Sequence, residues 1–203
     1  KDKCSFEEIV AYGEELFGHM LSLHKEGKEY AFVKEELPQY AANFGGEVVQ
    51  MNPCEEADFL MRCNEMETMP DIPEALHEFG KLGIPMYVLS NSGFTAEALS
   101  IVLEKLGIRQ YFRQIWSSAD YGRIKPDKGF FEMAIEKVLL ENPNLSRNDI
   151  VFIGDSYDTD VVGAAQAGLN VIWLNHKRDE NANNLPVHCI YDTSELEKKV
   201  KEL

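Results

Sequence analysis

The sequence predicts an α/β protein in which a doubly wound parallel sheet is joined to a small all-helical domain. From residue 70 onward, short apolar runs alternate with helical segments, and these runs are apolar throughout. Such strands are typical of a parallel sheet that helices cover on both faces. The first third of the chain shows only helical periodicity. We therefore expect a helical domain at residues 1–69 and an α/β domain at residues 70–203.

The helical part is expected to begin at Ser5, a suitable N-cap that is followed by acidic residues in the first turn. Apolar residues then recur near a helical period. A second helical stretch, 29–43, is interrupted by Pro38, and a third helix is expected from Pro53 to Glu67 with its proline in the first turn.

In the α/β part, helices and strands are expected to alternate along the chain. The expected helices cover residues 72–82, about 95–106, 129–141 and about 159–167. The expected strands are the runs PMYVLS, QIWSSA, DIVFIGD and NVIWLN. The polar segment 175–184 is typical of a surface loop.

The composition argues against several classes of partner. The chain of 203 residues carries a net charge of −15, whereas nucleic acids and anionic membranes are bound through clustered Lys and Arg. No apolar run reaches the roughly 18 residues of a spanning helix. The cysteines show no C-x-x-C spacing, which favours reduced thiols in a cytoplasmic protein. They are Cys4, Cys54, Cys63 and Cys189.

Polar and charged residues follow the predicted strands at the edge where ligands bind in open α/β sheets. Ser90 and Asn91 end one strand, Lys125 comes after another, and Asp155 and Asp160 follow a third. The hydroxyl and a neighbouring backbone N–H suit a phosphate oxygen, and the lysine suits developing phosphoryl charge. The carboxylates suit Mg²⁺, which would also relieve a repulsion of about 4 kcal/mol between carboxylates about 4 Å apart.

Three motifs in this order resemble the haloacid dehalogenase-like (HAD) hydrolase superfamily, which has a Rossmann-type core. "VLSNS" looks like its second motif, "RIKPD" its third and "VFIGDSYDTDVVGAAQAG" its fourth. The resemblance implies that Ser90 holds the transferring phosphoryl group and that Lys125 stabilises nucleophile and phosphate. It also implies that Asp155 ligates Mg²⁺ and that Asp160 supports the metal site, through a water or Lys125.

The helical first third resembles the cap that many members of this superfamily insert after their first motif. Such caps close over the substrate and provide selectivity. Arg62 is the only arginine of this part, and it is either a contact for an anionic substrate or an exposed charge paired with an acid. Asp158 has no role in the resemblance, and we interpret it as an acid at the start of a helix.

The superfamily's first motif, D-x-D-x-T/V, carries the nucleophilic aspartate and should lie before the cap, but it occurs nowhere in the 203 residues. The one D-x-D sequence, Asp158 to Asp160, belongs to the fourth motif. The chain also begins with Lys1 rather than methionine. We expect an upstream segment with the nucleophile, because without its strand two neighbouring strands would lack a partner.

The sequence thus predicts a Mg²⁺-dependent phosphatase that acts on a small phosphorylated metabolite through an aspartyl-phosphate intermediate. A phosphomutase and an inactive relative that only binds ligand remain alternatives. A 2-haloacid dehalogenase is disfavoured because its fourth motif usually lacks the pair found at Gly154 and Asp155. A receiver domain is disfavoured because its metal acids precede its lysine, whereas here Lys125 comes first.

Overall fold

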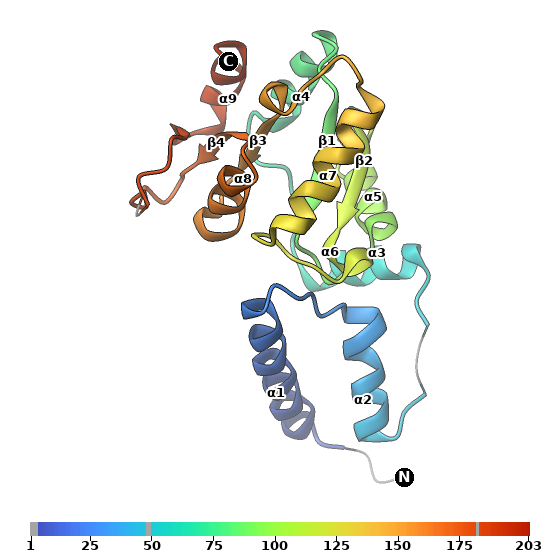
Figure 1. Ribbon diagram of the computed structural model, residues 1–203. Helices are drawn as coiled ribbons and strands as arrows, with labels where there is room; N and C mark the ends of the chain where they lie inside the picture. Colours follow the sequence, from blue (N-terminus) through green and yellow to red (C-terminus); the bar gives the residue numbers. More distant parts are fainter. Residues whose placement is uncertain (1–3, 48–49, 182) are drawn as a thin grey trace. The chain divides into compact units, whose positions relative to one another are not determined.

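The computed structural model describes residues 4–47, 50–181 and 183–203, and the chain forms two compact units (Figure 1). One unit comprises residues 1–65, 89–102 and 115–124, and the other comprises residues 66–88, 103–114 and 125–203. The domain boundary expected near residue 69 stays a prediction.

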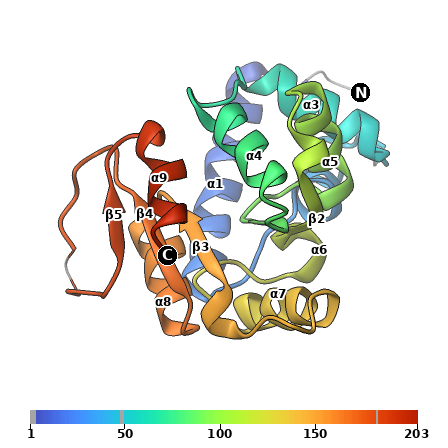
Figure 2. The same ribbon diagram turned by 90° about the horizontal axis from the view of Figure 1, so that it is seen from above.

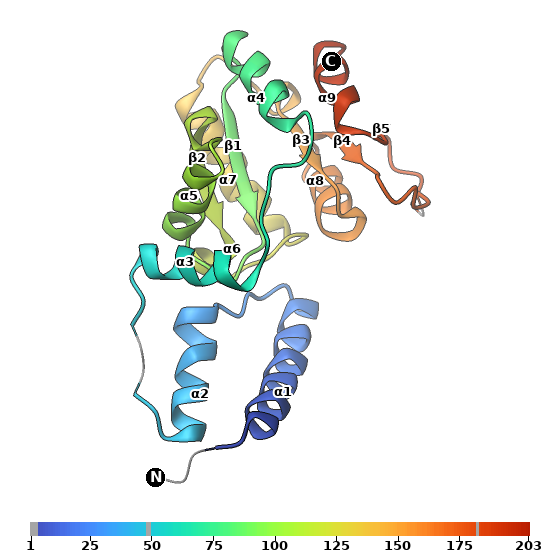
Figure 3. The ribbon, with the colours of Figure 1, turned by 180° about the vertical axis from the view of Figure 1, so that it is seen from behind.

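The first unit is mainly helical, and Figure 3 shows α1 and α2 side by side. Its helices and turns are α1 (Phe6–Lys25), the π-helical turn η1 (Phe32–Glu36), α2 (Leu37–Phe44), α3 (Pro53–Cys63) and α6 (Ser118–Tyr121). The ring of Tyr12 in α1 meets the rings of Tyr40 and Phe44 in α2 edge to face, with centroids 5.4 and 5.5 Å away. These aromatic contacts join the two helices.

Side-chain caps set where the first helices begin. The predicted N-cap is confirmed, because Ser5 Oγ accepts a hydrogen bond from Glu8 N while the Glu8 carboxylate accepts one from Ser5 N. Pro38 lies in the first turn of α2, directly after the π-helical turn η1, so the predicted interruption takes the form of a change from π-helical to α-helical hydrogen bonding at Leu37. The helix predicted to reach Glu67 ends at Cys63.

The second unit contains a parallel sheet in the order β3-β4-β5. Its strands are β3 (Val151–Gly154), β4 (Asn170–Leu174) and β5 (His188–Ile190). Its helices are α4 (Ile72–Lys81), α7 (Lys128–Glu141), α8 (Val162–Gln166) and α9 (Leu196–Lys201). Single-turn 3₁₀ helices are η2 (Arg109–Tyr111), η3 (Arg147–Asp149) and η5 (Thr193–Glu195).

Helices cover both faces of this sheet, as the apolar strands predict. In Figure 2, α9 lies on one side of β4 and α8 on the other. A buried cluster joins α4 and α9 to the sheet through Ala75, Phe79, Ile172, Leu174, Ile190 and Leu196. Ile172 and Leu174 alternate along β4 with Val171 and Trp173, and all four are buried. The predicted α/β class with helices on both faces is therefore confirmed.

Two further strands, β1 (Met86–Ser90) and β2 (Phe112–Ser117), form a separate two-stranded sheet. The helix α5 (Ala96–Lys105) follows β1 where a helix at about 95–106 was expected. β1 is only half-buried along its whole length, and Ile153 of β3 is 38% exposed, although both strands are apolar. Among the described strands, no partner covers the remaining edge of β3.

The C-terminal part holds elements that the sequence did not suggest. β5 has only three residues and α9 six, which is too short for a periodic pattern. Of the segment 175–184, the described residues form no helix or strand, as expected. The four cysteines are exposed free thiols. Among the described helices, none has both the length and the apolar character needed to span a bilayer.

Candidate active site

The predicted site residues are divided between the two units. Ser90 and Asn91 belong to the first unit, while Lys125, Asp155 and Asp160 belong to the second. Ser90 is half-buried and is the last residue of β1, and Asn91 is exposed directly after it. The strand-end positions of these residues are as expected, whereas their convergence on one ligand stays a prediction.

Two buried serines hold the loop that follows Ser90. Ser118 Oγ accepts a hydrogen bond from Ser92 N at 2.7 Å, and Ser117 Oγ donates to the carbonyl oxygens of Ser92 and Phe94. Ser117 is the last residue of β2, Ser118 is the first residue of α6, and both are fully buried. The loop after β1 is therefore fixed by side chains from the next strand.

A buried carboxylate from the helical segment joins this network. Glu29 accepts hydrogen bonds from Ser118 Oγ, from Tyr30 N at 2.8 Å and, in the appropriate tautomer, from His24 Nε2 at 3.2 Å. Its side chain is 4% exposed. Because a buried carboxylate needs such donors, Glu29 ties the segment after α1 to the serines that fix the strand-end loop.

Sequence reasoning missed these supporting residues. Ser117 and Ser118 form a polar pair directly after the apolar residues Ile115 and Trp116 of the predicted strand, which is the same kind of signal that identified Ser90. Glu29 gave no comparable signal, because a glutamate in a polar segment is usually exposed. Only the fold brings its side chain against Ser118.

In the second unit, a buried ion pair joins two predicted site residues. Lys125 Nζ lies 2.6 Å from Asp160 Oδ1, and their side chains are 11% and 8% exposed. Lys125 Nζ also lies 5.6 Å from the centre of the Phe152 ring, where the negative face of the ring favours the ammonium. Asp160 therefore contacts Lys125 directly, whereas its support of a metal site stays a prediction.

The backbone around β3 positions Asp160. Asp160 lies in the π-helical turn η4 (Tyr157–Val161), which begins the helix predicted near residue 159 and continues into α8. Asp160 Oδ2 accepts a hydrogen bond from Ser156 N at 3.2 Å. A Cβ at Gly154 would come within 2.5 Å of the Asp160 side chain, so the strand end must be glycine for this close packing.

Asp155 has a different environment at the same strand end. Its side chain is exposed, and its carbonyl oxygen accepts a hydrogen bond from Trp173 Nε1 at 3.1 Å. Asp158, also exposed, lies in the first turn of η4, as interpreted from the sequence. Arg62 is exposed in the last turn of α3.

The donor set at this strand end fits part of a magnesium site. Mg²⁺ usually takes one or two carboxylates and fills its other positions with water and phosphate oxygens. Asp155 offers an exposed carboxylate of that kind, whereas Asp160 already bonds Lys125 and Ser156. Within the described part of the chain, no three Asp, Glu, His or Cys side chains gather into a metal cluster. Asp155 is thus the residue here best suited to ligate the ion directly.

Comparison with known proteins agrees with the strand-end motifs. The model of the family described as haloacid dehalogenase-like hydrolase matches residues 29–174, which is most of the chain. The chain belongs to the haloacid dehalogenase-like hydrolase family. The match includes every predicted site residue, from Ser90 to Asp160.

Individual relatives in the family are phosphatases. The pyrimidine 5'-nucleotidase YjjG of Escherichia coli is 31% identical over 137 residues, which are 67% of this chain and 56% of that protein. The ribulose-1,5-bisphosphate 5-phosphatase of Halopiger xanaduensis is 25% identical over 118 residues, or 58% of this chain and 46% of that protein. The chain thus spans about half the length of these curated relatives.

A solved structure supports the fold. The HAD-hydrolase YfnB of Bacillus subtilis, whose structure is described as bound to magnesium, aligns with a TM-score of 0.64. The alignment covers 97% of this chain and 84% of that protein at 21% identity. At this identity the similarity concerns the fold.

Proposed function

We propose that the intact protein is a Mg²⁺-dependent phosphomonoester hydrolase that acts on a small phosphorylated metabolite. The observation that carries this proposal is the buried pair of Lys125 and Asp160 beside the exposed carboxylate of Asp155 at the end of β3. The buried ammonium of Lys125 suits a dianionic phosphate group, and the exposed carboxylate of Asp155 suits the metal ion that the phosphate binds. The phosphatase relatives support the same chemistry.

In the proposed reaction, each residue acts on the phosphoryl group in a specific way. The Ser90 hydroxyl and the Asn91 N–H hydrogen-bond its oxygens, and Lys125 neutralises charge that develops during transfer. Lys125 keeps its position because Asp160 holds it by a 2.6 Å ion pair. Asp155 would ligate Mg²⁺, which supplies charge neutralisation and orientation of the phosphate.

The nucleophile in this proposal is an aspartate on a strand upstream of Lys1. It displaces the leaving alcohol to form an aspartyl phosphate, which water then hydrolyses. The half-buried apolar strand β1 and the exposed Ile153 on the open edge of β3 support a further strand in the intact protein. Burial of this apolar surface by a further strand would stabilise the intact protein by about 25 cal/mol per Å².

The helical part predicted at residues 1–69 is proposed to serve as the cap that provides substrate selectivity. Two hydrogen bonds support that role: Phe32 N donates directly to Gly93 O in the strand-end loop, and Glu29 accepts from Ser118, which holds the same loop. Substrates of the relatives, a pyrimidine nucleotide and a sugar bisphosphate, are two options for the class of substrate here.

The test is hydrolysis of p-nitrophenyl phosphate by the intact protein with and without Mg²⁺. Asp155→Ala is expected to lower kcat/KM at least about 100-fold, because the direct metal carboxylate is lost. Asp158→Ala is the matched control, since Asp158 is an exposed acid three residues further along the chain, in η4, and its replacement is expected to leave the rate unchanged. Undiminished activity of Asp155→Ala would sink the assignment. Phosphate that moves within a sugar phosphate without release would indicate a mutase instead.

A further inference from the structure

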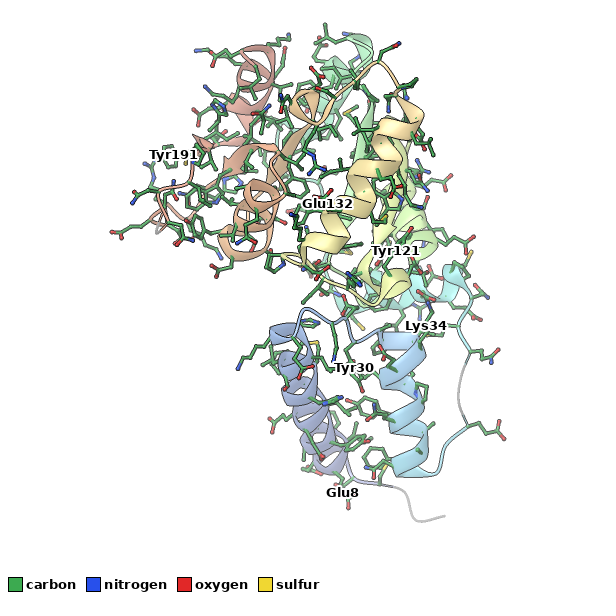
Figure 4. All side chains as sticks on the ribbon, in the orientation of Figure 1. Glu8, Tyr30, Lys34, Tyr121, Glu132 and Tyr191 are labelled. Atoms are coloured by element: carbon green, nitrogen blue, oxygen red, sulfur yellow. The ribbon has the colours of Figure 1, made fainter. Side chains whose placement is uncertain are left out.

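A pocket of about 250 Å³ lies within the first unit, next to the loop that follows Ser90. One side is formed by this loop and the other by the end of α1 and the segment up to η1; the side chain of Tyr30 in that segment is labelled in Figure 4. The lining residues are Met20, His24, Glu29, Tyr30, Phe32, Glu36, Asn91, Ser92, Gly93 and Phe94. A group bonded to a phosphoryl at Ser90 would therefore find this pocket directly beside it.

The two sides of the pocket are held together by the backbone and by aromatic rings. Phe32 N donates a hydrogen bond of 2.8 Å to Gly93 O, and a Cβ at Gly93 would come within 3.3 Å of Phe32 N. The Phe32 ring lies 5.2 Å from the Phe94 ring and stacks at 4.8 Å on Phe59. One part of the lining is therefore a fixed aromatic surface, which suits a flat ligand group.

The charges of the lining are of one sign. Glu29 and Glu36 both line the pocket, and its lining contains neither Lys nor Arg. A second phosphate placed about 4 Å from one of these carboxylates would be repelled by about 4 kcal/mol at an effective dielectric near 20. The pocket thus disfavours a substrate that carries a second anionic group.

Glu36 differs from Glu29 because its carboxylate oxygens can still accept a hydrogen bond from a ligand. Glu29 is bonded to Ser118, Tyr30 and His24, whereas the described residues provide no hydrogen-bond donor for the half-buried Glu36 carboxylate. Burial raises the pKa of Glu36 above its usual range. Burial first, and then the charges of Glu36 and Glu35, raise the pKa of Tyr30 to about 12. A half-buried carboxylate without a donor is an incomplete hydrogen-bond site.

We propose that this pocket holds the leaving group of the substrate and selects a planar, uncharged group with N–H or O–H donors, which Glu36 accepts. The inference rests on the proposed function, because it places the phosphoryl group at Ser90. It narrows the substrate class to monophosphates of such groups, of which a nucleoside 5'-monophosphate is the simplest example. Glu36 is then a specificity-determining residue that touches the substrate.

The test compares three substrates of the intact protein: cytidine 5'-monophosphate, glycerol 3-phosphate and fructose 1,6-bisphosphate. We expect kcat/KM to be highest for the cytidine ester. Glu36→Ala should lower it about tenfold or more for that ester, through loss of a hydrogen bond to a charged acceptor, and leave glycerol 3-phosphate within about twofold. Glu26→Ala is the matched control, because Glu26 is an exposed carboxylate outside the lining. An equal fall on all three substrates, or a preference of the unmodified protein for the bisphosphate, would overturn the inference.

A binding measurement separates this inference from the proposed function. If the intact protein fails to hydrolyse any phosphomonoester, including p-nitrophenyl phosphate, the proposed function is wrong. Titration calorimetry with cytidine then tests ligand binding in the pocket independently of hydrolysis, because cytidine carries no phosphate. Binding that weakens about tenfold in Glu36→Ala and not in Glu26→Ala supports the pocket, and absence of cytidine binding to the unmodified protein overturns it.

Discussion

Replacement of Lys125 by methionine is expected to lower the free energy of unfolding by about 3–5 kcal/mol, because it leaves a buried carboxylate without its partner. Lys125 Nζ lies 2.6 Å from Asp160 Oδ1, and the two side chains are only 11% and 8% exposed. Methionine keeps most of the length of the side chain, so the loss of packing is small. The measurement is urea unfolding of the chain followed by circular dichroism.

The control for this prediction is an ion pair with nearly the same distance between nitrogen and oxygen but with an exposed lysine side chain. Lys81 pairs with Glu78 at 2.7 Å, with a lysine side chain that is 58% exposed. Lys81→Met is expected to cost less than about 0.5 kcal/mol, as for other exposed pairs. If Lys125→Met and Lys81→Met lowered the free energy of unfolding equally, the ion pair of Lys125 and Asp160 would not be shielded from solvent.

A double replacement separates the charge from the contact. Lys125→Met with Asp160→Asn removes both charges and keeps the shape of both side chains, so it is expected to be about 1–3 kcal/mol more stable than Lys125→Met alone. Both variants of the intact protein are expected to be inactive, since neither holds a cation for the phosphoryl group. Recovered stability without recovered activity is the combined result to look for.

The second large effect is expected at Gly154, where alanine should destabilise the chain by about 3 kcal/mol. The new Cβ would come within 2.5 Å of Cβ and Oδ2 of Asp160. Asp160 cannot turn away without losing Lys125 Nζ on one oxygen and Ser156 N on the other. The steric conflict therefore breaks the buried ion pair as well, and phosphatase activity of the intact protein is expected to fall with it.

Gly18→Ala shows what the same change does without a steric conflict. Gly18 lies in the interior of α1, and nothing lies within 4 Å of the added Cβ. Alanine there is expected to stabilise the chain by about 1 kcal/mol through its helix propensity. Melting temperatures that shift in opposite directions are expected for the two variants, and a Gly154→Ala protein as stable as the unmodified chain contradicts the packing argument.

Much of the α/β part could be predicted, because strongly apolar strands and strand-end residues are local signals. The strand ending at Ser90, the helix α7 and the helix-opening acids of η4 all follow from such signals. Helix ends were less predictable: α3 stops at Cys63, and the stretch around Pro38 passes from the π-helical turn η1 into α2. A proline in the sequence does not by itself say whether the helix stops there or changes its hydrogen-bond pattern.

The sequence by itself determined the family motifs, the residue types at the strand ends and the sign of the charge. These depend on neighbours along the chain, so the order of Ser90, Lys125 and Asp155 is enough to recognise them. Only the tertiary structure decided that Lys125 is buried against Asp160 and that Glu29 hydrogen-bonds Ser118. It also decided that Glu36 lines a pocket, where the described residues give its carboxylate no hydrogen-bond donor. The physical reason is the separation along the chain: Lys125 and Asp160 are 35 positions apart, and Glu29 and Ser118 are 89 positions apart. A local sequence pattern does not show which distant side chains will bury and pair with a given charge.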